Sequence, residues 1–208
     1  MKLQLALDDI TLEKALELVE NVQDYVDIIE VGTPMVMEYG TIPVRELKKR
    51  FPDKKVLADL KIMDAGKYEA ETALKAGADY ITVLGVTDDG TIEGCVEAAR
   101  AYGSFAVADM ICVKNMEERV KRLENLGVDI LSVHTGVDQQ AAGRTPLDDL
   151  KVMRGVVTSA EISVAGGISA ETLPAYLEYR PEIVIVGSGI THAKDPRVAA
   201  EKIFRLLN

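Results

Sequence analysis

The segment Lys55–Asp64 reads KVLADLKIMD, and it decides how the rest of the chain is interpreted. Its apolar VLA stretch is typical of a buried strand, and charged residues follow where that strand is expected to end: Asp59, Lys61 and Asp64. Because side chains alternate along a strand, Asp59 and Lys61 are expected on the same face. Asp64 is expected in the turn that precedes a predicted helix over Ala65–Ala76.

Two acids and an amine at the carboxyl end of a strand have two interpretations. They can be a solvated strand end with incidental charges, which is the commoner situation for a single Asp or Lys. They can also belong to a functional site. We favour the site, because similar polar residues follow other predicted strands of this chain.

Short apolar segments alternate with helical segments along the whole chain. The predicted strands are Leu3–Leu7, Asp27–Val31, the segment beginning at Val56, Ala78–Leu84, Ser104–Asp109, Asp129–Val133, Ile162–Ala165 and Ile183–Val186. One helix is predicted to begin at Thr11, and a second follows Gly32–Pro34 and runs to about Arg50, with a break near Gly40 and Pro43. A loop through Gly143 and Pro146 precedes a helix that ends near Gly155. The other predicted helices cover Ala65–Ala76, Asp89–Tyr102, Asn115–Leu126, Ala170–Glu178 and Pro196–Leu207.

This alternation gives eight strand–helix units of about 26 residues each. The strands are near-continuous apolar runs, as expected of parallel strands covered by helices. Eight such units without a change in composition favour one (β/α)₈ TIM barrel over a doubly wound sheet. We therefore predict a single α/β domain that spans residues 1–208.

The polar strand ends gain a common position from this fold. All eight carboxyl ends of a (β/α)₈ barrel lie on one rim, and that rim carries the active site. The residues predicted there are Asp8, Glu30, Asp59, Lys61, Asp64, Asp109, His134, Gly166, Gly167, Gly187 and Ser188. The amino-terminal strand ends are less polar, and this asymmetry predicts an enzyme.

Composition excludes several other functions. The formal net charge of −10 argues against nucleic-acid binding, which needs clustered Lys and Arg. No apolar run is long enough to cross a membrane. Cys95 and Cys112 lack the spacing of a metal site, so we expect free thiols in a reducing, cytoplasmic location.

The predicted rim carries several carboxylates and one lysine, which requires compensation. Some acids are protonated, water enters, or a divalent cation binds. Mg²⁺ commonly uses one or two carboxylates together with waters and substrate oxygens. Glu30 and Asp59, on neighbouring strands, are the pair we assign to it; the alternative for Glu30 is a hydrogen-bonded structural acid.

Two glycine-rich turns and one histidine complete the predicted site. Gly166–Gly167 and Gly187–Ser188 follow the last two strands, where backbone amides form the phosphate site common in this fold. Each turn alone could be no more than a tight turn. His134 is either a structural histidine or an acid–base group that works near neutral pH.

The segment Asp59–Asp64 matches the DxKxxD motif of the orotidine 5′-phosphate decarboxylase superfamily. Across nearly the whole chain, the sequence resembles the 3-hexulose-6-phosphate synthase family. The matching segments are LQLALD at Leu3–Asp8, IIEVGTP at Ile28–Pro34, VLADLKIMDAG at Val56–Gly66, ITVLGVTD at Ile81–Asp88, VHTGVDQQAAG at Val133–Gly143, VAGGI at Val164–Ile168 and IVGSGIT at Ile185–Thr191.

The resemblance implies a Mg²⁺-dependent aldol reaction between formaldehyde and D-ribulose 5-phosphate. It implies that Glu30 and Asp59 bind Mg²⁺, and that Lys61 stabilises an enediolate together with the cation. His134 would move the proton at the first carbon of the sugar, and Asp59, Lys61 and Asp64 would belong to the catalytic group. Asp64 would reach the active site of the neighbouring subunit in a homodimer.

The resemblance also implies that Asp8 and Asp109 line the sugar end of the site. A second function stays open, because the related 3-keto-L-gulonate-6-phosphate decarboxylases share the metal, lysine and histidine positions. Those enzymes typically carry an Arg three residues after the histidine, where this chain has Val137. A third possibility is a non-catalytic protein that binds sugar phosphates. The physiological direction of the reaction is left open.

Overall fold

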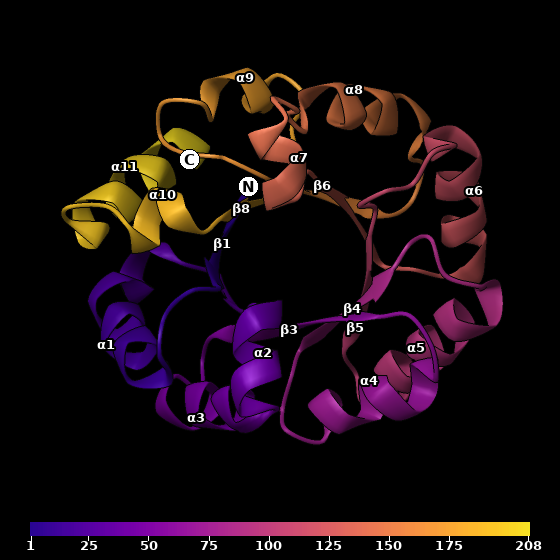
Figure 1. Cartoon of the computed structure of the whole chain (residues 1–208), viewed down its shortest axis with the longest axis horizontal. Coiled ribbons are helices and arrows are strands. Elements are labelled where there is room, and N and C mark those ends of the chain that lie inside the picture. The colour runs from indigo at the N-terminus through magenta and orange to yellow at the C-terminus, as the bar shows by residue number, and fades with distance from the viewer.

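Eight parallel strands close into a barrel in a computed structural model that describes all 208 residues (Figure 1). The strands are β1 (Lys2–Leu7), β2 (Ile28–Val31), β3 (Lys55–Ile62), β4 (Tyr80–Leu84), β5 (Phe105–Asp109), β6 (Ile130–His134), β7 (Glu161–Ala165) and β8 (Ile183–Val186). Each strand pairs with the next in sequence, and β8 pairs with β1 to close the barrel. The predicted (β/α)₈ barrel is confirmed.

Helices surround this ring of strands (Figure 1). They are α1 (Leu12–Val22), α2 (Thr33–Tyr39), α3 (Ile42–Arg50), α4 (Gly66–Leu74), α5 (Asp89–Ala101), α6 (Met116–Leu126), α7 (Val137–Ala141), α8 (Leu147–Val156), α9 (Pro174–Leu177), α10 (Ser188–Thr191) and α11 (Pro196–Leu207), with a 3₁₀ turn at Gln23–Tyr25. Side-chain caps begin two of them, at Thr11 for α1 and Asp195 for α11. The predicted break near Gly40 separates α2 from α3.

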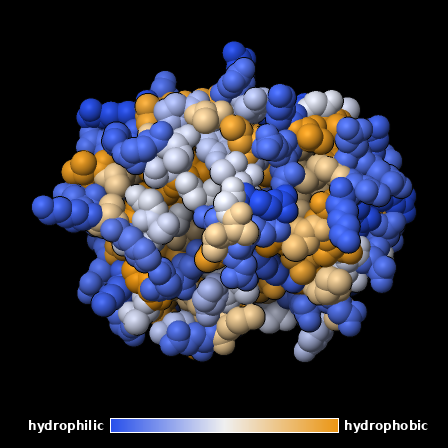
Figure 2. All heavy atoms as spheres, turned by 45° about the horizontal axis from the view of Figure 1, so that its top comes forward, coloured by the Kyte–Doolittle hydropathy of each residue, from blue (hydrophilic) through white to orange (hydrophobic).

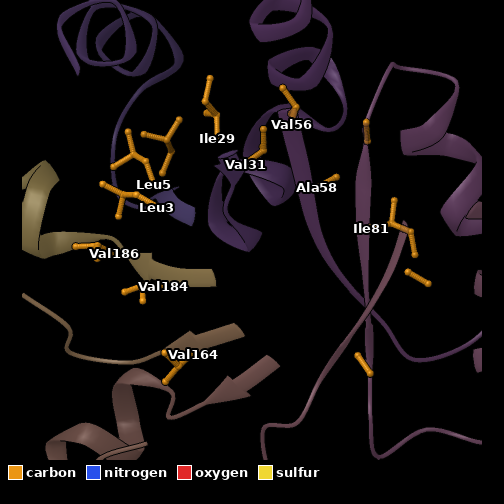
Figure 3. Close-up of a cluster of buried hydrophobic side chains, with 14 of the residues drawn as sticks. Leu3, Leu5, Ile29, Val31, Val56, Ala58, Ile81, Val164, Val184 and Val186 are labelled. Carbon is orange, nitrogen blue, oxygen red and sulfur yellow. The ribbon is translucent and has the colours of Figure 1, made fainter. Parts of the chain in front are cut away.

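Alternation along the strands divides the buried residues into two layers. The outer layer is a cluster of 50 buried residues between strands and helices, and Figure 3 shows part of it on β1, β2, β3, β4, β7 and β8. The inner layer contains a cluster of only six, at the amino-terminal end of the barrel: Ile28, Leu57, Tyr80, Val107, Ile130 and Ile183. Apolar packing therefore leaves the carboxyl end of the barrel interior to polar side chains.

The structure corrects three details of the predicted elements. The third strand does not end before Asp59 but continues to Ile62, so the first charged residues belong to the strand itself. The predicted helix Ala170–Glu178 is wrong in extent, because the hydroxyls of Ser169 and Thr172 hold a turn there and the helix is limited to Pro174–Leu177. Two short helices, α7 and α10, occupy segments where the sequence predicted loops.

The surface is mostly hydrophilic, with hydrophobic residues in smaller groups between the polar ones (Figure 2). The most exposed large hydrophobic side chains include Met37, Tyr68 and Val137. None of the helices is both long enough and apolar enough to cross a membrane.

Candidate active site

A cavity of about 700 Å³ opens at the carboxyl ends of the strands. All of the residues predicted for the site line it except Asp64: Asp8, Glu30, Asp59, Lys61, Asp109, His134, Gly166, Gly167, Gly187 and Ser188. The strand order brings these residues together from seven segments of the chain, which is why they are distant in sequence and close in space. The predicted rim is therefore a real concave site.

An irregularity in β3 positions Lys61. The pairing of β3 with β4 shifts between Ala58 and Ile62, and Lys61 adopts a left-handed backbone with φ of 47°. Its amide donates to the hydroxyl of Thr82 at 2.9 Å, which holds the bulge in place. A non-glycine residue in this region is strained, and such strain is common at functional sites.

The Lys61 ammonium lies between two buried carboxylates. It contacts Asp59 directly and lies 3.3 Å from Asp109. Burial on its own would lower the pKa of Lys61, but the negative charges of Asp59 and Asp109 outweigh it and raise the pKa. The side chain therefore keeps its positive charge throughout the neutral range.

His134 and Asp109 form a hydrogen-bonded pair. The Nδ1 atom of His134 lies 2.8 Å from an Asp109 carboxylate oxygen. Burial opposes ionisation of Asp109, yet His134 and Lys61 hold the pKa of this carboxyl below its ordinary value. An ionised Asp109 accepts the Nδ1 proton, so Nε2 is the ring nitrogen left to accept a proton from a ligand in the cavity.

Two hydroxyl groups that were not among the predicted site residues fix the orientation of Asp59. Thr82 donates to one carboxylate oxygen at 2.7 Å, and Thr33 donates to the other at 2.8 Å. Gln4, also unidentified, donates to Glu30 at 2.7 Å. For Gln4 and Thr82 the available signal was periodicity, since polar residues at every second strand position face the barrel interior. Thr33 begins α2, so strand periodicity gave no signal for it.

Glu30 and Asp8 are the acids whose ionised forms are least compensated in the cavity. Burial, together with the nearby Asp59, raises the pKa of Glu30 to about 8. The same two causes raise the pKa of Asp8. Lys61 is already held by Asp59 and Asp109, so these acids have no cation of their own.

This donor set fits a divalent cation. Glu30 pairs with Leu57 in the β2–β3 ladder, so Glu30 and Asp59 are on adjacent strands, as the sequence predicted. No group of three His, Cys, Asp or Glu side chains converges on one point. Two carboxylates with water or substrate oxygens in the remaining positions suit Mg²⁺.

The two glycine-rich turns present free backbone amides to the cavity. The amides of Gly166, Gly167 and Gly187 have no acceptor within the protein. Gly166 and Gly167 have φ values of 122° and 67°. A Cβ on Gly166 would lie 2.6 Å from the carbonyl oxygen of Thr135, so this position requires glycine.

Asp64 is separate from this cluster. It is exposed, it does not line the cavity, and its carboxylate accepts a hydrogen bond from the amide of the neighbouring Ala65. The single chain therefore brings the other predicted residues together but leaves Asp64 outside.

Residues 1–203 match the Orotidine 5′-phosphate decarboxylase / HUMPS family, so the chain belongs to this family. Among its relatives, the 3-hexulose-6-phosphate synthase of Bacillus subtilis (strain 168) is 49% identical over 207 residues, covering 100% of this chain and 99% of the relative. Such relatives place the chain among enzymes of the aldehyde-lyase type.

Solved structures agree with this assignment. A 3-hexulose-6-phosphate synthase from Salmonella typhimurium superposes with a TM-score of 0.98 at 53% identity, covering 100% of this chain and 98% of that one. A ligand-bound KGPDC from Streptococcus mutans has a TM-score of 0.91 at 28% identity, covering 99% and 96%.

Proposed function

We propose that this chain condenses formaldehyde with D-ribulose 5-phosphate to give D-arabino-hex-3-ulose 6-phosphate, and catalyses the reverse reaction, with Mg²⁺ bound. The observation that carries the proposal is the group formed by His134, Asp109, Lys61 and Asp59 inside one cavity. It combines a base with fixed positive charge, which is what proton removal beside a carbonyl requires.

His134 is the proposed base. With Nδ1 held by Asp109, its Nε2 atom takes the proton from the first carbon of the sugar, and the electron pair left on that carbon forms the enediolate. The same carbon then bonds to the formaldehyde carbon. The aldehyde oxygen receives the electron pair of its C=O bond and a proton, which completes the addition.

Lys61 is the proposed electrostatic stabiliser of the enediolate oxygens. Its position between Asp59 and Asp109 fixes the ammonium before substrate binds, so little reorganisation is needed during the reaction. Glu30 and Asp59 would hold Mg²⁺. When bound, this cation would supply further positive charge for the oxygens of the sugar.

The free amides of Gly166, Gly167 and Gly187 are the proposed phosphate site. Asp8 lies between the glycine turns and the catalytic group, because one of its carboxylate oxygens is 3.5 Å from where a Cβ on Gly187 would stand and, besides burial, the nearby Asp59 raises its pKa. We assign Asp8 and Asp109 to the sugar end of the substrate, and Ser188 to its phosphate end.

One residue, Val137, favours the synthase activity over the decarboxylase activity. Val137 lines the cavity mouth and is 81% exposed. It supplies no charged group where the decarboxylases typically carry an arginine. Sequence identity points the same way. It is 49% and 53% to the two synthases but 28% to the Streptococcus mutans KGPDC, a 3-keto-L-gulonate-6-phosphate decarboxylase.

We further propose a cytoplasmic homodimer with shared active sites. Exposed Asp64 is flanked by Met63, which is 54% exposed, and Tyr68 of α4 is 77% exposed. Apolar side chains of this size beside a lone carboxylate suit a surface that a second copy covers. Both cysteines are free thiols, which supports a reducing compartment.

Incubation with D-ribulose 5-phosphate and formaldehyde, with and without Mg²⁺, tests the function. We expect hexulose 6-phosphate to form with Mg²⁺ and formation to stop after chelation. A parallel incubation with 3-keto-L-gulonate 6-phosphate measures the decarboxylase activity. Decarboxylation without aldol addition would replace the proposal, and full activity after exhaustive chelation would exclude the cation.

A further inference from the structure

The cavity continues below the predicted catalytic group into the barrel interior. Its deeper wall contains two serines and three isoleucines, which we call the floor pocket: Ser132, Ser163, Ile130, Ile183 and Ile185. Strand register connects it to the site above. Asp109 pairs with Ser132 on β6, and Ser132 pairs with Ser163 on β7.

The hydroxyl of Ser163 has no partner within the protein. Ser163 is only 2% exposed, and its Oγ atom makes no hydrogen bond. Its neighbours Ile162 and Val164 belong to the outer apolar layer, so alternation turns Ser163 toward the cavity that it lines. A buried hydroxyl without a partner is unfavourable, so this position calls for a small ligand with an oxygen atom.

The remaining walls restrict the size and polarity of that ligand. Ser163 pairs with Ile183, and Ile130 and Ile185 line the same part of the cavity. These side chains carry no charge, unlike the carboxylates and Lys61 above them. A neutral molecule of two or three heavy atoms with one hydrogen-bonding oxygen matches the pocket better than a sugar or an anion.

We propose that the floor pocket binds the small aldehyde substrate, with the Ser163 hydroxyl donating a hydrogen bond to the aldehyde oxygen. This inference rests on the proposed function and names the place of its second substrate. The sugar phosphate extends from His134 and Lys61 toward the glycine turns, so the aldehyde meets its first carbon from below. As the new C–C bond forms, the aldehyde oxygen gains an electron pair, and the Ser163 hydrogen bond strengthens there.

The first test is Ser163→Ala, with Thr135→Val as its matched control. Thr135 is also buried, and its hydroxyl is also without a partner, but it does not line the cavity. For Ser163→Ala we expect the KM for formaldehyde to rise about tenfold, the scale of one lost hydrogen bond. The KM for D-ribulose 5-phosphate, and exchange of its first-carbon proton without formaldehyde, should stay within about twofold. Thr135→Val should leave all three quantities unchanged.

The second test enlarges the pocket with Ile185→Ala. We expect kcat/KM for acetaldehyde relative to formaldehyde to rise by about tenfold, because the removed atoms make room for the additional methyl group. This selectivity is measured within one variant, so a partial loss of folded protein does not affect it.

The outcomes separate this inference from the function on which it rests. An unchanged formaldehyde KM in Ser163→Ala would overturn the pocket assignment. A loss of proton exchange in parallel with the aldol reaction would overturn it as well, since the damage would then be general. If the wild-type chain catalyses no aldol addition, the proposed function fails, and the aldehyde pocket fails with it.

Discussion

At the residue scale, His134 is the group whose role can be isolated most cleanly. We expect His134→Asn to retain D-ribulose 5-phosphate binding but to lose exchange of the first-carbon proton by about a hundredfold or more, the scale of a positioned acid–base group. Exchange is followed by NMR in deuterated water without formaldehyde.

The chain offers a matched control for this substitution. His192, the other histidine, is exposed and paired with Asp9 at 2.7 Å, and it does not line the cavity. His192→Asn should exchange at the wild-type rate. Native exchange in His134→Asn would transfer the role to another group.

Glu30 provides a prediction about pH. Its pKa in the folded chain is raised from the ordinary 4.5 to about 8, so between these values the folded state holds a proton that the unfolded state has lost. The free energy of unfolding of the metal-free protein should therefore fall as the pH rises from about 4.5 to about 8. Glu30→Gln should flatten this slope, as measured by urea unfolding at several pH values.

Mg²⁺ should act against this loss of stability. The cation competes with the proton for Glu30, so it should raise the melting temperature more at pH 8 than at pH 6. Glu30→Gln should show little of this difference. Equal pH slopes in the two proteins, measured without metal, would remove Glu30 as the source.

The sequence predicted these charged residues but not the neutral residues that hold them. Asp59, Lys61 and His134 were recognisable because charge at the end of an apolar strand is unusual. Gln4 and Thr82 were overlooked, since they resemble ordinary strand residues until the barrel register turns them inward. Thr33 was overlooked because it resembles an ordinary first residue of a helix. Their partners lie on other segments of the chain that only the closed barrel brings close, and no local pattern contains this information.

At the scale of elements, the turn after β7 is built around glycine. Gly166→Ala would place a Cβ 2.6 Å from the Thr135 carbonyl oxygen, at a φ of 122°. The turn has to shift, which moves the proposed phosphate amides. We expect the KM for D-ribulose 5-phosphate to rise at least about tenfold, with destabilisation of about 1–3 kcal/mol.

Gly155→Ala is the control for this change. Gly155 lies in α8 with no atom within 4 Å of an added Cβ, and alanine is the better helix former. The control should keep the wild-type KM and gain up to about 1 kcal/mol of stability. An unchanged KM in Gly166→Ala would separate this turn from phosphate binding.

Elements were predictable to the extent that their sequences repeat a simple pattern. The β-strands followed from short apolar runs, and the predicted bounds of α5 and α6 lie within one or two residues of the observed ones. The bulge in β3 did not, because Lys61 reaches its positive φ through the Thr82 hydroxyl on the next strand. The helix predicted over Ala170–Glu178 failed for a local reason, since the Ser169 and Thr172 hydroxyls compete for the backbone amides there.

At the scale of the whole molecule, the barrel explains why one chain collects its site from distant segments. The closed strand order places every strand end on one rim, so a fold predicted from eight repeats also predicted which residues meet. Asp64 is the exception, because it lies outside the cavity of its own chain.

A shared site makes a specific prediction about mixed dimers. Lys61→Ala and Asp64→Asn should each be inactive alone, since each removes one of the two groups from every site. In a heterodimer of the two variants, one site loses both groups, and the other combines the native Lys61 of one chain with the native Asp64 of its partner. An equal mixture after complete subunit exchange should therefore recover up to about a quarter of the wild-type activity, because half of the dimers are mixed and each carries one intact site.

The control pairs Lys61→Ala with His134→Asn. Both residues lie in the same cavity, so each chain of a mixed dimer lacks one of them and no site is complete. This mixture should stay inactive at the same degree of exchange, which native mass spectrometry can measure. Recovery in both mixtures would point to residual activity of the variants. Recovery in neither, with exchange complete, would mean that Asp64 does not act across a subunit boundary.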